Sequence, residues 1–173
     1  MKNKNNMKKG SENVTGADNR QERLDSQWLT GFVDGEGCFH VSINRLQKMT
    51  LGYQVLPEFR VVQHQRDQEL LNRFKDFFEF GNVVINHGDR MAFRIRGLEN
   101  LNKIVKFFNR NLLQTSKRND FKFFAQIIQL MNNKEHLKRE GLEKIAELAS
   151  KMNRKVSRNL ESSETICQTL GDR

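Results

Sequence analysis

The sequence has few of the residues that build disulfide frameworks, zinc sites and membrane spans. Its 173 residues include two cysteines, four histidines and one proline. Cys38 and Cys167 lie far apart, so no disulfide framework is predicted, and the scattered histidines disfavour a zinc site. No apolar run approaches the length of a membrane span and no signal-peptide core is visible, which predicts a soluble, intracellular protein. The single proline, Pro57, cannot donate to a strand ladder, so it marks a bulge or an edge position.

Acidic residues are also in deficit. Thirty lysines and arginines against 21 acids give a formal net charge of +9, which indicates a polyanionic partner. The length suits one domain with a substantial core. The composition predicts a disordered polar leader over residues 1–23, a packed domain over 24–153 and a polar tail over 154–173, without an internal repeat.

The most informative stretch is residues 29–37, Leu-Thr-Gly-Phe-Val-Asp-Gly-Glu-Gly. Its apolar positions predict a short helix that runs directly into a strand. Gly31 and Gly35 lie four residues apart, so they share a helix face without side chains on which another helix can pack closely. A two-fold dimer of identical chains is the simplest closed arrangement of such a face.

Two carboxylates stand at the predicted end of this helix. Gly35 and Gly37 are expected to end it between Asp34 and Glu36. Because a helix C-terminus carries partial negative charge, acids there are unfavourable. A bound divalent cation would turn them into a site, with Glu36 and nearby backbone carbonyls as hard oxygen ligands. The alternative is a glycine-capped helix with solvated acids.

The remaining hydrophobic pattern alternates between period two and helical spacing. It predicts the order helix, strand pair, helix, strand pair, helix, followed by two further helices. This is an α+β half-unit, αββαββα, with a four-stranded antiparallel sheet and additional C-terminal helices. The predicted segments after the first helix are strands 39–43 and 53–63, helix 70–78, hairpin 83–95 and helices 98–108, 121–131 and 142–152.

One face of this sheet is predicted to be polar, basic and poor in acids. Two-stranded ribbons fit the major groove of DNA, and side chains at period two can contact base edges there. The alternative is a solvated sheet face, which antiparallel sheets often have. The candidate DNA- or RNA-contacting residues are His40, Ser42, Asn44, Arg60, Asn86, His87, Arg90, Arg94 and Arg96.

The stretch 29–37 resembles, at all nine positions in character, the LAGLIDADG motif of homing endonucleases. The resemblance implies that Glu36 is a metal ligand, that the backbone carbonyl of Gly35 is a second ligand, and that Asp34 is a structural capping group. It also implies that the motif helix, with Gly31, Phe32 and Gly35, forms the contact between two half-molecules.

Two further stretches extend the resemblance, which runs from about residue 28 to 131. The strand ending at Gln63 resembles the family's second strand, so Gln63 is expected to orient the attacking water or the phosphate; its alternative role is an ordinary surface amide. Residues 113–121 resemble the loop that carries the family's catalytic basic residue. The position often held by lysine falls on Ser116, so Lys117 is the predicted basic group, and Arg118 is the alternative and a further DNA contact.

The combined interpretation is a site-specific, double-strand DNA endonuclease of the LAGLIDADG type. The resemblance implies an intron-encoded homodimer that depends on Mg²⁺, with Mn²⁺ or Ca²⁺ able to occupy the site. Such an enzyme cuts a long pseudo-palindromic target and leaves short 3′ overhangs, in an organelle (chloroplast or mitochondrion) or a bacterial cytoplasm. No Ser/His/Asp or Cys/His nucleophile constellation is evident, which agrees with direct attack by water. The alternatives are an intron-splicing maturase that binds RNA and a DNA-binding transcription regulator of the same fold.

Overall fold

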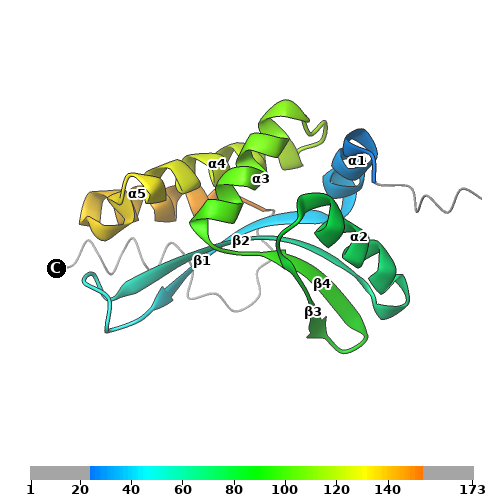
Figure 1. Cartoon of the computed structure of the whole chain (residues 1–173). Helices are drawn as coiled ribbons and strands as arrows, with labels where there is room; N and C mark the ends of the chain where they lie inside the picture. Colours follow the sequence, from blue (N-terminus) through cyan, green and yellow to red (C-terminus); the bar gives the residue numbers. More distant parts are fainter. Residues whose placement is uncertain (1–23, 154–173) are drawn as a thin grey trace, which may run out of the picture.

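The computed structural model describes residues 24–153; the predicted leader and tail lie outside the described residues. Short 3₁₀ helices at Gln65–Asp67 and Glu135–Leu137 supplement the main elements. Within the described range, no helix combines the length and apolar character needed to span a membrane. The main elements are α1 (Ser26–Glu36), β1 (Gly37–Arg45), β2 (Tyr53–His64), α2 (Gln68–Phe78), β3 (Asn82–His87), β4 (Arg90–Ile95), α3 (Leu98–Arg110), α4 (Lys117–Asn132) and α5 (Arg139–Ser150) (Figure 1).

The predicted α+β order is confirmed: four antiparallel strands form one sheet in the order β1-β2-β4-β3. The helices cover one face of this sheet (Figure 1). Alternation along the strands turns Phe39, Phe59, Phe93 and Ile95 towards the helices, where all four side chains are fully buried. The polar side chains between them therefore lie on the uncovered face.

The core between sheet and helices is built largely from phenylalanine. The ring of Phe39 contacts the rings of four other phenylalanines at centroid distances of 5.3 to 5.5 Å: Phe59, Phe108, Phe121 and Phe124. Burying one such side chain contributes about 1.5–3 kcal/mol to folding. Since Phe39 follows the end of α1 by three residues, this cluster also holds that end of α1 in place.

The junction between α1 and β1 differs in one respect from the prediction. Gly35 does not end the helix: α1 continues through Glu36, so both carboxylates belong to its last turn. Gly37 makes the transition, because a Cβ there would lie 2.5 Å from a side-chain carbon of Val33. At the other end, the Asp25 carboxylate caps α1 by accepting hydrogen bonds from two backbone N–H groups.

Two strand positions show where local pattern and tertiary packing differ. Pro57 lies in the part of β2 that pairs with β1 alone, because pairing with β4 begins at Phe59. This part of β2 is therefore a sheet edge, as one of the two alternatives for Pro57 predicted. The other alternative, a β-bulge, is wrong because the β1–β2 register is regular at Pro57. Ile85, an apolar residue two positions after Val83 in the predicted hairpin, is 74% exposed. It precedes an irregularity in the β3–β4 register, on an edge strand.

Candidate active site and nucleic-acid interface

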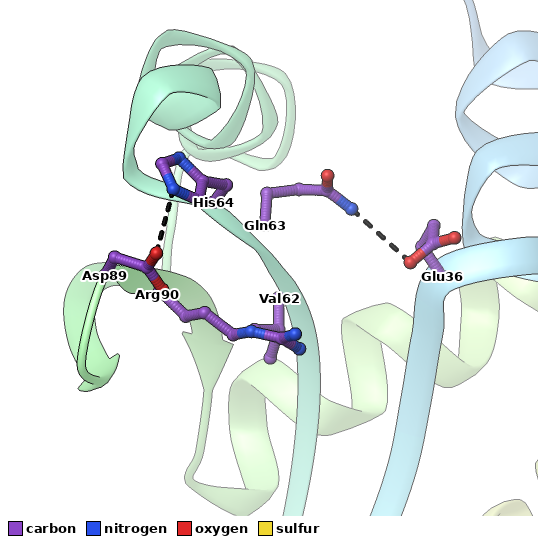
Figure 2. Close-up of a pocket in the computed structure, with 6 residues that line it drawn as sticks. All are labelled: Glu36, Val62, Gln63, His64, Asp89 and Arg90. Atoms are coloured by element: carbon purple, nitrogen blue, oxygen red, sulfur yellow. Dashed lines mark hydrogen bonds and ion pairs between the residues drawn. The ribbon is translucent and has the colours of Figure 1, made fainter.

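Two of the predicted catalytic side chains meet at the end of α1. Glu36 is the last residue of that helix, and its Oε2 lies 3.5 Å from Nε2 of Gln63, near the end of β2. Both face a hollow of about 270 Å³ (Figure 2). A carboxylate and an amide thus share one solvent-accessible space. The lining residues are Glu36, Val62, Gln63, His64, Asp89 and Arg90.

Asp34 ties the end of α1 to the segment before α4. Its carboxylate accepts hydrogen bonds from the backbone N–H groups of Gln114 (2.8 Å) and Thr115 (3.0 Å), and from the Thr115 hydroxyl (2.6 Å). These contacts join residues about 80 positions apart in the chain. Asp34 therefore caps the loop that leads into α4, rather than its own helix.

The hydrogen bonds of Asp34 with Gln114 and Thr115 place Lys117 beside the α1 terminus. The Lys117 ammonium donates to the carbonyl oxygen of Gly37 and lies 3.5 Å from that of Gly35. A cation at this point faces the negative end of the helix dipole. Ser116 and Arg118 are exposed, and the contacts of the described residues place neither side chain at the α1 terminus. The geometry favours Lys117 among the three alternatives as the basic group of the site.

Thr115 connects the Asp34 hydrogen bonds to Lys117, so substitution of Thr115 tests this arrangement, which is called the Asp34 clamp below. Its hydroxyl donates to Asp34 and accepts a hydrogen bond from the Lys117 backbone N–H at 3.2 Å. Thr115→Val keeps the shape and removes both bonds, so we expect the free energy of unfolding to fall by about 1 kcal/mol. Urea unfolding measures this loss, and Thr115→Ser is the matched control that restores the hydroxyl. Equal stability of Thr115→Val and the parent protein would contradict the Asp34 clamp.

The donor atoms at this terminus fit part of a divalent-cation site. The Glu36 carboxylate and the Gly35 carbonyl are the hard oxygens that Mg²⁺ and Ca²⁺ prefer. Among residues 24–153, however, no three His, Cys, Asp or Glu side chains gather closely enough to hold a metal ion. The candidate donors at this terminus are thus one carboxylate and one backbone carbonyl, and Mg²⁺ commonly takes its remaining ligands from water and substrate phosphates.

The outward face of α1 is open. A Cβ at Gly31 or Gly35 would meet nothing within 4 Å. Beside them, Trp28 is 46% exposed and its ring stacks on Phe32 at a centroid distance of 5.2 Å. Within the described domain no contact explains the two glycines, while the flat surface suits a second helix.

The uncovered sheet face brings most of the predicted nucleic-acid contacts together, but it is not acid-poor in its centre. Arg60 and Arg94 lie opposite each other in the β2–β4 register, and Arg96 follows directly after β4. All three point at Glu58, whose side chain is 6% exposed. The expectation of an acid-poor face is therefore wrong at this point, because β2 inserts a carboxylate between the arginines.

His40 and Ser42 lie on the same face in β1, joined by a 2.9 Å hydrogen bond between imidazole and hydroxyl. Burial lowers the pKa of His40, the Arg60 guanidinium lowers it further, and the Glu58 carboxylate opposes both. His40 is consequently neutral at neutral pH, so it offers hydrogen bonds rather than charge.

The other predicted contacts lie towards the ends of strands. Asn44 is exposed near the end of β1, and Asn86 and His87 are exposed at the end of β3. Arg90 lines the hollow beside Glu36 rather than the centre of the face. The candidate residues on the sheet therefore divide into a β1 group with His40, Ser42 and Asn44, a central arginine group, and a group at the β3–β4 turn.

Sequence reasoning assigned no site role to three polar residues, Glu58, His64 and Asp89. Glu58 alternates with the buried Phe59 and was visible as an acid on a basic strand face. His64 directly follows Gln63, and its imidazole lies 3.0 Å from the Asp89 carboxylate across the hollow (Figure 2). No local pattern signals that pair, since its members meet only through the pairing of β2 with β4.

The structure thus places a carboxylate at the tip of an exposed, glycine-bearing helix, next to a sheet whose uncovered face is rich in arginine. The fold is that of the homing endonucleases. The chain belongs to the LAGLIDADG endonuclease family, whose model matches residues 29–128. A curated relative, probable intron-encoded endonuclease 3 of Neurospora crassa, is 32% identical over 138 residues, which are 78% of this chain.

Solved structures agree with this assignment. The homing endonuclease I-TnaI has a TM-score of 0.76 and 46% identity, with 86% of this chain and 97% of that chain covered. I-SmaMI, bound to its uncleaved DNA target in the presence of calcium ions, has a TM-score of 0.77 and 32% identity, with 83% and 48% covered. The chain spans 26% of the length of the Neurospora relative, and an equal share of another curated relative from Podospora anserina.

Proposed function

We propose that this chain forms a site-specific endonuclease that cuts both strands of a DNA target with the help of Mg²⁺. The observation that carries the proposal is the joint position of Glu36, Gln63 and Lys117 at the end of α1. Gln63 lies in β2, three residues after Arg60, which the uncovered face of the sheet offers to a duplex. Membership of the family supports the same activity.

Phosphodiester hydrolysis needs a positioned water, neutralisation of the developing charge and assistance to the leaving 3′ oxygen. Glu36 and the Gly35 carbonyl would hold Mg²⁺, which when bound supplies Lewis acidity and a more acidic water. The Gln63 amide orients the attacking water or the phosphate, because it reaches the same hollow as Glu36. The Lys117 ammonium adds positive charge next to the scissile phosphate.

We further propose that two copies act together. Residues 24–153 offer one helix with the glycine pair Gly31 and Gly35 and with Glu36 at its tip, whereas cutting two strands needs two such sites. The open face of Gly31, Phe32 and Gly35 supports a helix pair across a two-fold axis. Related structures are matched over 97% of one chain and 48% of another, which fits one-copy and two-copy arrangements of the same unit.

The names of curated relatives support a proposal for the cellular setting. Curated relatives carry names that describe intron-encoded endonucleases. We propose that this chain is likewise encoded in an intron, and that it acts on DNA inside an organelle.

Selection from a randomised duplex library tests the activity directly. With Mg²⁺ present, the protein should release cleaved molecules that share one long, pseudo-palindromic sequence with the cut at its centre, and EDTA should stop the release. Molecules that are enriched by binding but remain uncut in Mg²⁺ and Mn²⁺ would instead identify a binding protein, such as a maturase or a regulator.

Arg60 offers a test of base reading. Its guanidinium lies on the uncovered face and can reach a base edge, so Arg60→Ala should weaken binding to the selected target by about 1–3 kcal/mol and relax preference at one position. Competition binding against single-base variants of the target measures both effects. Lys106→Ala, an exposed change in α3, is the matched control. Equal weakening for every sequence would show that Arg60 contacts phosphate instead.

A further inference from the structure

Glu58 occupies an unusual position for an acid. It lies in β2, in the middle of the uncovered sheet face, and is 5% exposed. Its carboxylate is 2.5 Å from Nε of Arg96, 3.3 Å from Nε of Arg94 and 3.9 Å from Nη1 of Arg60. One buried negative charge is therefore shared by three guanidinium groups.

The direction of these contacts leaves the outer ends of two arginines available. Arg96 donates its Nε–H to Glu58 at 2.5 Å, whereas Nε of Arg94 is buried 3.3 Å from the same carboxylate without forming a hydrogen bond. Bidentate contacts to guanine use the terminal nitrogens of a guanidinium, which the inward Nε contact does not consume. The carboxylate thus orients the Arg96 guanidinium by a hydrogen bond and holds that of Arg94 nearby by charge, and neither contact uses a terminal nitrogen.

Affinity alone does not account for this acid. A carboxylate on a surface that meets polyanionic DNA lowers the attraction between the two. Stability does not require it either, because a buried ion pair is often no more stabilising than apolar residues of similar volume. What the arrangement does provide is a common anchor for three long side chains that would otherwise sample many rotamers, through a hydrogen bond to Arg96 and ion pairs with Arg94 and Arg60.

On this basis, which rests on the proposed function, we propose that Glu58 is a specificity-determining positioning residue. It holds Arg60, Arg94 and Arg96 in the orientation that reads base edges. In doing so it weakens contact with DNA of any other sequence, because an ordered arginine paired with a carboxylate adapts poorly to phosphates at other positions.

The test compares Glu58→Gln with the parent protein on the selected target and on an unrelated duplex, across a series of salt concentrations. The variant should bind the unrelated duplex more tightly and with a salt slope steeper by about one unit. Binding to the selected target should not improve, so the ratio of the two affinities should fall at least tenfold. Glu99→Gln in α3 makes the same charge change away from the sheet and should leave this ratio unchanged.

A second readout needs no DNA. The Nε–H signal of Arg96, which donates to Glu58, should be sharp in an NMR spectrum of the parent protein and broadened in Glu58→Gln. If Glu58→Gln fails to fold, Glu58→Asp keeps the charge while withdrawing the carboxylate from the guanidiniums, and its affinity ratio should fall as well.

The outcomes separate this role from the proposed function. A parent protein that prefers no duplex over any other would overturn the proposed function, and this role with it. A parent preference that survives in Glu58→Gln, or in Glu58→Asp where Gln does not fold, would overturn the role of Glu58 alone. Equal tightening on both duplexes would also overturn it, because Glu58 would then act only through its charge.

Discussion

Glu36→Gln should abolish cleavage of the selected target while leaving binding to it within a few-fold of the parent protein. The substitution keeps the size of the side chain and its 3.5 Å neighbour Gln63, but removes the charge that would hold a divalent cation. Loss of Lewis-acid assistance is expected to slow cleavage by about a thousandfold or more, which corresponds to ~4 kcal/mol of transition-state stabilisation. Single-turnover cleavage and equilibrium binding on the same duplex measure the two quantities.

Folding should be unaffected in this variant, because the Glu36 side chain is exposed in the described domain. Glu99→Gln, an exposed acid in α3, is the matched control and should cleave at the parent rate. Cleavage by Glu36→Gln near the parent rate in Mg²⁺ would place the active site elsewhere.

Gly31→Leu should break the proposed dimer and, at the same time, stabilise the monomer. A side chain at Gly31 would meet nothing within 4 Å of its Cβ inside the described domain. Replacing a helical glycine with a good helix former should therefore raise the free energy of unfolding of one chain by about 0.5–1 kcal/mol. Between two closely packed helices, however, the same side chain forces the helices apart, so dimer formation and cleavage should be lost together.

Sedimentation, thermal unfolding and cleavage of the same preparation separate these effects. Gln126→Leu in α4 adds the same side chain at an exposed helical position away from α1, and should change neither assembly nor activity. A Gly31→Leu protein that still sediments as an active dimer would contradict the proposed interface. A parent protein that cuts both strands as a monomer would do so as well.

The architecture was predictable because hydrophobic periodicity directly reports which face of an element is buried. Phe39 and Phe59 alternate with polar residues and prove to lie side by side in the core. The exceptions are positions governed by the whole sheet. Ile85 reads as a core residue, yet it lies exposed on an edge strand at a register irregularity.

The site was predictable only in part, for a physical reason. The motif identifies Glu36 as a candidate ligand through local sequence, but its contact with Gln63 depends on how β2 packs beside the end of α1. The position of Lys117 beside the α1 terminus likewise depends on the Asp34–Thr115 hydrogen bonds at the start of α4, and its role as the basic group stays a prediction. The grouping of arginines around Glu58 arises from the pairing of β2 with β4, and the sequence of either strand alone does not reveal that pairing.

Conversion of a supercoiled plasmid that carries the selected target tests the central claim most directly. We expect the protein with Mg²⁺ to convert the plasmid to the linear form, with a cut in each strand offset to give 3′ overhangs, and we expect EDTA or Glu36→Gln to leave it supercoiled. A parent protein that binds this plasmid tightly yet leaves both strands intact in Mg²⁺ and Mn²⁺ would contradict the account.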